Sequence, residues 1–248
     1  MPTIYLSPST QEFNQYADGG NEEYYMNLIA DAMLPYLQAS GITVIRNTPD
    51  MTAASSIAAS NAADVDFHLA LHSNAAAGEN AGNIRGSEVY YAPSSQNGER
   101  AAEIFANNLK WIYPIPERVR TVSTTSLGEV NKTRAPAVLI EYAYHDNPED
   151  AQWIRQNIVE IAENTVLSLT DYFGIPFNLP EQIGEAVVST PGGGNLNLRE
   201  HPNTSARIIT AIPNGTTVQI YARLPEWDLV SFGNWMGYVY SPYLTVLS

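Results

Sequence analysis

The chain has 248 residues, of which 44% are hydrophobic and 15% charged, so one large or two modest domains with a full core can form. Its net charge of -14 argues against nucleic acid and anionic lipid surfaces as partners, because few Lys and Arg side chains are available to neutralise phosphates. Because the sequence contains no cysteine, disulfides, thiolate metal sites and a cysteine nucleophile are excluded.

The amino-terminal residues give no targeting signal, and no run reaches the length of a membrane span. Met1-Pro2 leads straight into an apolar run, without the basic start and apolar core of a signal peptide. We therefore expect a protein outside the membrane, exported by another route or numbered from a processed start.

Strands and helices alternate through about residue 175. Alternating or continuous apolar residues predict strands over residues 3–8, 42–46, 65–72, 87–92, 119–125 and 137–144. Apolar residues at helical spacing predict helices over 21–41, 51–63, 97–111 and 148–174. This order is typical of an α/β fold, a mostly parallel sheet with helices on both faces.

The pattern changes after this region. Residues 177–185 contain prolines and predict a linker, and short strands with turn signals such as Pro213-Asn-Gly follow. We therefore expect an α/β domain over residues 1–176, a linker over 177–185 and a small all-β barrel over 186–248.

The strand over residues 65–72 ends in polar residues, His72-Ser73-Asn74. In open α/β sheets ligands bind at the carboxyl ends of the strands, so His72 is a candidate metal ligand. A lone histidine is more often a hydrogen-bonded core residue, so the interpretation depends on other residues.

Two acids support that interpretation. Glu141 follows four apolar residues of a predicted strand, where desolvation would raise its pKa and suit it to acid/base chemistry. A salt bridge to Lys132 or Arg134 is an equally good explanation. Glu23 lies in the first turn of a predicted helix, where an acid commonly just stabilises the helix dipole. Together with His72, the two acids match the ligands and proton acceptor of a hydrolytic zinc site.

These motifs, in this order, resemble those of the zinc-dependent N-acetylmuramoyl-L-alanine amidases of the cell-wall hydrolase type. The resemblance covers residues 3–173 and rests on Asn-Glu-Glu23-Tyr-Tyr-Met, Leu-His72-Ser-Asn-Ala and Val-Leu-Ile-Glu141. It implies Zn²⁺ as cofactor, Glu23 and His72 as ligands, Glu141 as catalytic residue, and Asn74 and Asn147 as substrate-binding or supporting residues.

The family's first ligand, a histidine shortly after the first strand, is missing. Thr10 stands at that position, and oxygen donors such as Gln11 lie nearby. We expect Gln11 to supply the third ligand, while His145, which follows the catalytic strand, is the alternative that could swing in. A weakened or absent metal site is the competing interpretation.

The carboxyl-terminal region resembles a bacterial SH3 domain, through Leu196-Asn-Leu-Arg, Gly215-Thr-Thr-Val and Gly237-Tyr-Val-Tyr-Ser-Pro-Tyr. Such modules commonly bind cell-wall peptides, and aromatic rings provide contact area without charge. We expect a wall-binding groove, although the same rings could simply fill the barrel core. Its expected lining is Trp235, Tyr238, Tyr240 and Tyr243.

The sequence therefore predicts a monomeric, wall-associated peptidoglycan hydrolase outside the cell, which cleaves the amide between N-acetylmuramic acid and L-alanine. A non-catalytic peptidoglycan-binding protein with a degenerate metal site is one alternative. A metal-dependent peptidase that acts within the stem peptide is the other.

Overall fold

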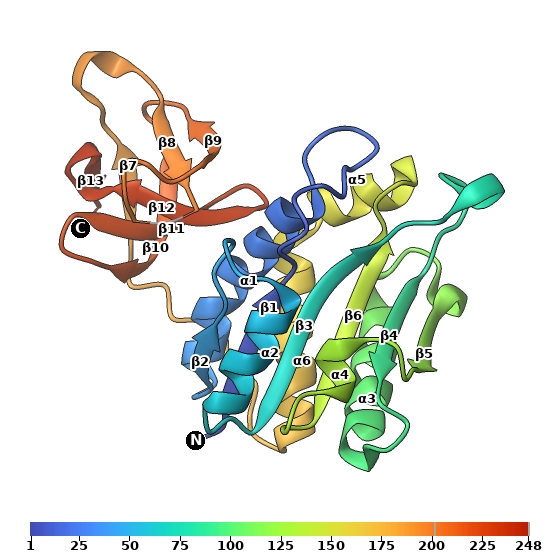
Figure 1. The fold of residues 1–248 in the computed structure, drawn as a ribbon. Helices are drawn as coiled ribbons and strands as arrows, with labels where there is room; N and C mark the ends of the chain where they lie inside the picture. Colours follow the sequence, from blue (N-terminus) through green and yellow to red (C-terminus); the bar gives the residue numbers. More distant parts are fainter. Residues whose placement is uncertain (201, 248) are drawn as a thin grey trace.

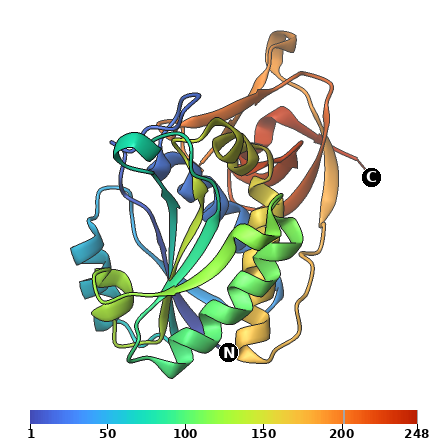
Figure 2. The same ribbon diagram turned by 90° about the vertical axis from the view of Figure 1, so that its right-hand side faces the viewer.

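The computed structural model describes residues 1–200 and 202–247, which form a six-stranded and a seven-stranded sheet. The first sheet carries helices on both faces, and the second forms a smaller all-β unit beside helix α1 (Glu22–Ala39) (Figures 1 and 2). This architecture confirms the predicted fold class. A helix with the length and apolar character needed to cross a membrane does not occur among the described residues.

The first sheet has the strand order β2-β1-β3-β6-β4-β5. Its neighbours pair in parallel except β4 and β6, so the sheet is mostly parallel, as predicted. The strands are β1 (Thr3–Pro8), β2 (Thr43–Arg46), β3 (Phe67–Asn74), β4 (Ser87–Tyr91), β5 (Val119–Ser123) and β6 (Ala137–Tyr144).

The helices form two layers. Helix α1 packs against α6, and α6 against α3, behind the sheet in Figure 1, while α2 and α4 pack together in front of it. The remaining bounds are α2 (Ala53–Ala62), α3 (Gln96–Ile112), α4 (Gly128–Asn131), α5 (Pro148–Gln156) and α6 (Ile158–Phe173). The single helix expected over 148–174 is divided at Asn157, whose φ of -124° and ψ of 27° depart from helical values.

Strand alternation divides the core between the two faces. Leu69, Leu71 and Ile140 belong to the large cluster under α1, α3 and α6. On the other face, Ala70 and Leu139 belong to a much smaller cluster with Val130 of α4. Because short helices cover this second face, polar side chains near the carboxyl ends of β1 and β3 are left beside a pocket rather than under a core.

The seven-stranded sheet has the order β13-β7-β10-β11-β12-β8-β9, with antiparallel pairing throughout. Two of its side chains, Leu229 and Met236, are buried in the same core cluster as the first sheet, so the two units are packed together. The strands are β7 (Gly184–Val188), β8 (Leu196–Arg199), β9 (Ile208–Ile212), β10 (Thr217–Arg223), β11 (Trp227–Phe232), β12 (Trp235–Tyr240) and β13 (Leu244–Val246).

Candidate functional site

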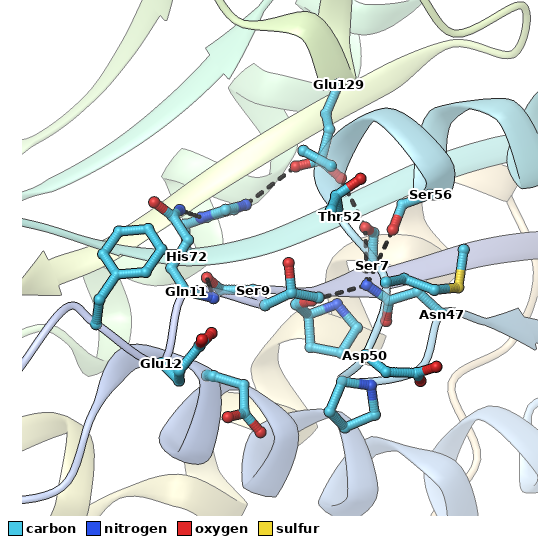
Figure 3. A pocket seen from close by; sticks show the side chains of 17 residues that line it. Ser7, Ser9, Gln11, Glu12, Asn47, Asp50, Thr52, Ser56, His72 and Glu129 are labelled. Atoms are coloured by element: carbon cyan, nitrogen blue, oxygen red, sulfur yellow. Dashed lines mark hydrogen bonds and ion pairs between the residues drawn. The ribbon is translucent and has the colours of Figure 1, made fainter.

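A pocket of about 610 Å³ opens at the carboxyl ends of β1 and β3. The loop after β1 forms one wall, the segment from Asn47 to Ser56 forms another, and His72 and Glu129 lie at one side (Figure 3). Thr10, at the position where the family resemblance implies a histidine, also lines it. The pocket therefore coincides with the region where the sequence predicts a metal site.

Glu22, and not Glu23, is the acid that contacts His72. Glu22 Oε1 lies 2.8 Å from His72 Nδ1, and Oε2 accepts a 2.6 Å hydrogen bond from Asn14. Asn21 caps α1 by accepting a bond from the Tyr24 backbone, which fixes the first turn. Glu23, one residue further around the helix, lines the pocket instead, and its carboxylate lies 3.9 Å from the Arg207 guanidinium. The contact with His72 is therefore made by Glu22, and not by Glu23, the acid expected as ligand.

Glu129 is a site residue that the sequence analysis missed. It lies on the short helix α4, and its buried carboxylate lies 3.1 Å from His72 Nε2 and 3.3 Å from His68 Nε2. It also accepts a 2.6 Å hydrogen bond from the Ser7 hydroxyl. Burial would raise the pKa of Glu129, but hydrogen bonds and charge from His68 and His72 lower it far below its usual value.

His72 therefore lies between two carboxylates. Burial would lower the pKa of its imidazole, but hydrogen bonds and attraction from Glu129 and Glu22 outweigh burial and raise that pKa well above its usual value. For Glu22, burial would raise the pKa, but contacts with His72 lower it. Without a metal ion, this raised pKa favours the imidazolium form, in which the ring can donate one N–H to each carboxylate.

Gln11 approaches the same ring nitrogen. Its Nε2 lies 3.4 Å from His72 Nδ1, and the two side chains lie next to each other in Figure 3. Gln11, Glu22 and His72 therefore converge on one point, although they come from the loop after β1, from α1 and from β3.

Glu141 lies directly beside His72, its register partner on the neighbouring parallel strand. Burial raises the pKa of Glu141 to about 8, and the negative charges of Glu22 and Glu88 add to this effect, against the attraction of His72. Its Oε2 is buried without a hydrogen-bond partner. The salt bridge to Lys132 or Arg134 that the sequence allowed is not formed within the described residues.

Asn74 extends the site toward β4. Its Nδ2 donates a 3.2 Å hydrogen bond to Glu88 Oε2, and Arg120 forms an ion pair with the other oxygen of Glu88. Glu88 is the register partner of Glu141 on the antiparallel side, so Asn74 belongs to the polar surroundings of Glu141.

His145 and Asn147 are engaged elsewhere. His145 Nδ1 lies 3.0 Å from the Ser73 hydroxyl and 2.8 Å from the Ser73 carbonyl, and its ring stacks on Tyr16. Asn147 caps α5, accepting bonds from two backbone amides, and donates to the Gly82 carbonyl. His145 thus contacts the loop after β1, Asn147 holds the segment at Gly82, and neither contacts His72 or Glu141 through a hydrogen bond.

Comparison with known families decides what this arrangement belongs to. Residues 9–171, well over half of the chain, match the family described as N-acetylmuramoyl-L-alanine amidase. The chain belongs to this amidase family. Residues 194–245 match the family described as bacterial SH3 domain. The resemblances seen in the sequence are thereby confirmed, and peptidoglycan is the substrate that the two families together imply.

Solved structures of amidases share the fold of the first domain. The amidase AmiC2 of Nostoc punctiforme superposes with a TM-score of 0.62 at 16% identity, covering 70% of this chain and 97% of that one. The catalytic domain of CwlV from Bacillus (Paenibacillus) polymyxa var. colistinus gives 0.61 at 15% identity, covering 71% and 100%. The catalytic domain of the CD27L endolysin, which targets Clostridia difficile, gives 0.56 at 20% identity, covering 69% and 98%. A direct sequence search of curated proteins found no match.

The amidase family is generally zinc-dependent, so the side chains near His72 are the candidates to hold a metal ion. Among residues 1–200 and 202–247, no group of three or more His, Asp and Glu side chains is placed to hold a metal ion. The Glu22 carboxylate and the His72 imidazole meet here, the Gln11 amide lies next to them with its Nε2 3.4 Å from His72 Nδ1, and Glu141 is the register partner of His72. Zinc accepts imidazole and carboxylate ligands, and amide oxygens also bind divalent cations. The Glu22–His72 pair and the oxygen of the Gln11 amide are donor types that a divalent cation accepts, with one imidazole fewer than the resemblance implies.

The four aromatic residues expected to bind the wall are divided between two surfaces of the SH3 barrel. Trp235 and Tyr238 pack against the core of the amidase domain, and Tyr238 lines a cavity together with Leu34 and Pro35 of α1. Neither residue lines the groove of the other two, and they point to opposite faces of β12, since Trp235 also packs against the barrel's own core. Tyr240 and Tyr243 line a separate groove of about 240 Å³.

Proposed function

We propose that this amidase hydrolyses the bond between the lactyl group of N-acetylmuramic acid and L-alanine in a zinc-dependent reaction, outside the cell and attached to the wall. The observation that carries the proposal is the buried, unpaired oxygen of Glu141 beside the Glu22–His72 pair. A buried carboxylate oxygen without a hydrogen-bond partner lowers the stability of the fold. Such groups, and groups with strongly shifted pKa values, concentrate in active sites.

His72, Glu22 and Gln11 would hold the ion, since all three reach the same side of the His72 ring. When bound, zinc would polarise the scissile carbonyl and make water a better nucleophile. Glu129 would accept the Nε2–H of His72, which keeps the Nδ1 lone pair directed toward Glu22. An ion must displace the proton that His72 and Glu22 share, so we expect zinc binding to strengthen as pH rises.

Glu141 would manage the proton in the reaction. A carboxyl group with a pKa of about 8 can both accept and release a proton near neutral pH. It would take the proton of the attacking water as the carbon–oxygen bond forms. It would then deliver that proton to the nitrogen of L-alanine as the carbon–nitrogen bond breaks, which yields a free carboxylic acid and a free amine.

Neighbouring residues would orient the substrate. Asn74 is held by Glu88 at the edge of the site and is the proposed contact for the stem peptide. His145 and Asn147 would act indirectly, by fixing the loops to which they are hydrogen-bonded.

The SH3 barrel would hold the enzyme on its polymer through the groove at Tyr240 and Tyr243. The rings of Trp227, Tyr240 and Tyr243 meet edge to face, which gives the groove a rigid aromatic wall. Asn197 and Arg199 at the groove provide polar contacts for a peptide. Even weak binding there would raise the local concentration of scissile bonds.

The test is to digest purified peptidoglycan and identify the amino termini that appear. The proposal expects L-alanine, and a loss of about 10²- to 10⁴-fold in rate for Glu141→Gln, the usual contribution of a general acid/base. Glu103→Gln, at an exposed position on α3, is the matched control and should keep full activity. Release of another residue would indicate a stem-peptide peptidase. Binding without any new termini would indicate recognition without turnover.

A further inference from the structure

The SH3 barrel reaches the amino-terminal turn of α1, which carries Glu22. The guanidinium of Arg207, which lies just before β9, is 4.2 Å from the centroid of the Tyr24 ring. It also lies 3.9 Å from the carboxylates of Glu23 and Glu200. One barrel side chain therefore contacts two of the first three residues of the helix.

This contact lies on a larger interface rather than at the end of a flexible tether. Met236 and Leu229 of the barrel are 3% and 4% exposed and share a core with the amidase domain. At a second point, the Asn234 side chain donates a 2.7 Å hydrogen bond to the Gln156 carbonyl at the end of α5. The interface fixes the barrel's position, so Arg207 is held against the helix.

From Tyr24, contacts continue to the site. The ring of Tyr24 lies 4.9 Å from that of Tyr25, and Tyr25 lies 4.5 Å from Tyr16. The Tyr16 hydroxyl donates a 2.9 Å hydrogen bond to Ser73, the residue after His72. Ser73 in turn donates its backbone N–H to Glu22 Oε1. A packed series of rings thus joins the barrel to both members of the Glu22–His72 pair.

We propose that the barrel is a working part of the catalytic unit and that Arg207 is a positioning residue, which fixes the first turn of α1 and thereby the carboxylate of Glu22. The inference rests on the proposed function, because it assigns Glu22 to the reacting site. It differs from tethering in a measurable way. A tether speeds only the attack on the polymer, whereas a positioning contact also affects a small soluble substrate.

The experiment compares Arg207→Ala with wild type on a soluble N-acetylmuramoyl peptide. Removal of a cation–π contact corresponds to a loss of between about 2-fold and about 30-fold. We expect a loss in this range in kcat, with KM within about 2-fold of wild type and a parallel loss of zinc affinity. Arg207→Lys, which keeps the cation, should restore part of the loss. Arg223→Ala removes the same charge from an exposed barrel position and should behave as wild type.

A second measurement does not depend on turnover. Amide hydrogen exchange in the first turn of α1 should be faster in Arg207→Ala than in Arg223→Ala, because the turn has lost its contact with the barrel. Equal kcat and equal exchange in the two variants would overturn the inference. A wild-type protein that leaves the soluble peptide intact would instead count against the proposed function, and the exchange result would still decide the role of Arg207.

Discussion

The two adjacent acids at the start of α1 allow a sharp test, since replacing each with glutamine changes the same charge one residue apart. Glu22 is 1% exposed and lies 2.8 Å from His72 Nδ1, whereas the Glu23 side chain is 16% exposed and lies 3.9 Å from Arg207. Replacing a residue that hydrogen-bonds to a metal ligand typically lowers metal affinity 10- to 100-fold. A direct ligand should cost more, so we expect Glu22→Gln to lower both zinc affinity and kcat/KM by at least about 100-fold.

For Glu23→Gln the expected loss is much smaller. A partly exposed ion pair is worth up to about 1 kcal/mol, which corresponds to a factor of about 5. Zinc affinity would be measured by competition with a chromophoric chelator, and kcat/KM on the soluble N-acetylmuramoyl peptide. Circular dichroism of both variants would check that α1 is intact. A larger effect for Glu23→Gln than for Glu22→Gln would refute the assignment.

Three further predictions concern other parts of the protein. The pKa of Glu141 is raised to about 8 in the folded state, so the folded protein favours the neutral carboxyl group. Metal-free wild type should therefore lose stability relative to Glu141→Gln as pH rises from about 4.5 to about 8. Denaturant unfolding at several pH values checks this, and a constant difference would contradict it. Glu129→Gln should weaken zinc binding by about 10- to 100-fold, with unchanged affinity for the wall; calorimetry measures the first and wall sedimentation the second. Tyr243→Ala should weaken wall binding without lowering the melting temperature. Trp235→Ala should instead lower the free energy of unfolding by about 1–3 kcal/mol and leave wall binding unchanged. The reverse pattern would indicate that Trp235, and not Tyr243, binds the wall.

The sheet and its active edge could be predicted from the sequence because both depend on local patterns. Runs of apolar residues set β3 and β6, and each run ends in polar residues where the strand leaves the core. Placing His72 beside Glu141 needs only that the two strands are parallel neighbours, which the alternation of strands and helices favours.

The choice between Glu22 and Glu23 depended on the phase of a helix. Successive residues of a helix point about 100° apart, so neighbouring acids face different surroundings. Glu22 lies four residues before Met26, on the stripe that continues through Ile29 and Met33, and these residues are all buried. The sequence therefore held a signal for Glu22, but the position of the ligand glutamate in the family motif favoured Glu23.

Neither the role of Glu129 nor the side of the barrel that docks on the amidase domain could be predicted from a pattern in the sequence. Glu129 lies on a four-residue helix, and its contacts with His68 and His72 span 61 and 57 residues of sequence. Trp235 and Tyr238 belong to a strand with apolar side chains on both faces, and only the packing of the two domains decides which of these side chains stay accessible. Both features depend on tertiary contacts rather than on periodicity.

The most direct test is anomalous scattering at the zinc edge from crystals of the whole chain grown with zinc. The account predicts one strong peak within bonding distance of His72 Nδ1, with Glu22 and Gln11 around it and Glu141 close by. Well-ordered crystals without a peak there, or with zinc bound only elsewhere, would contradict it.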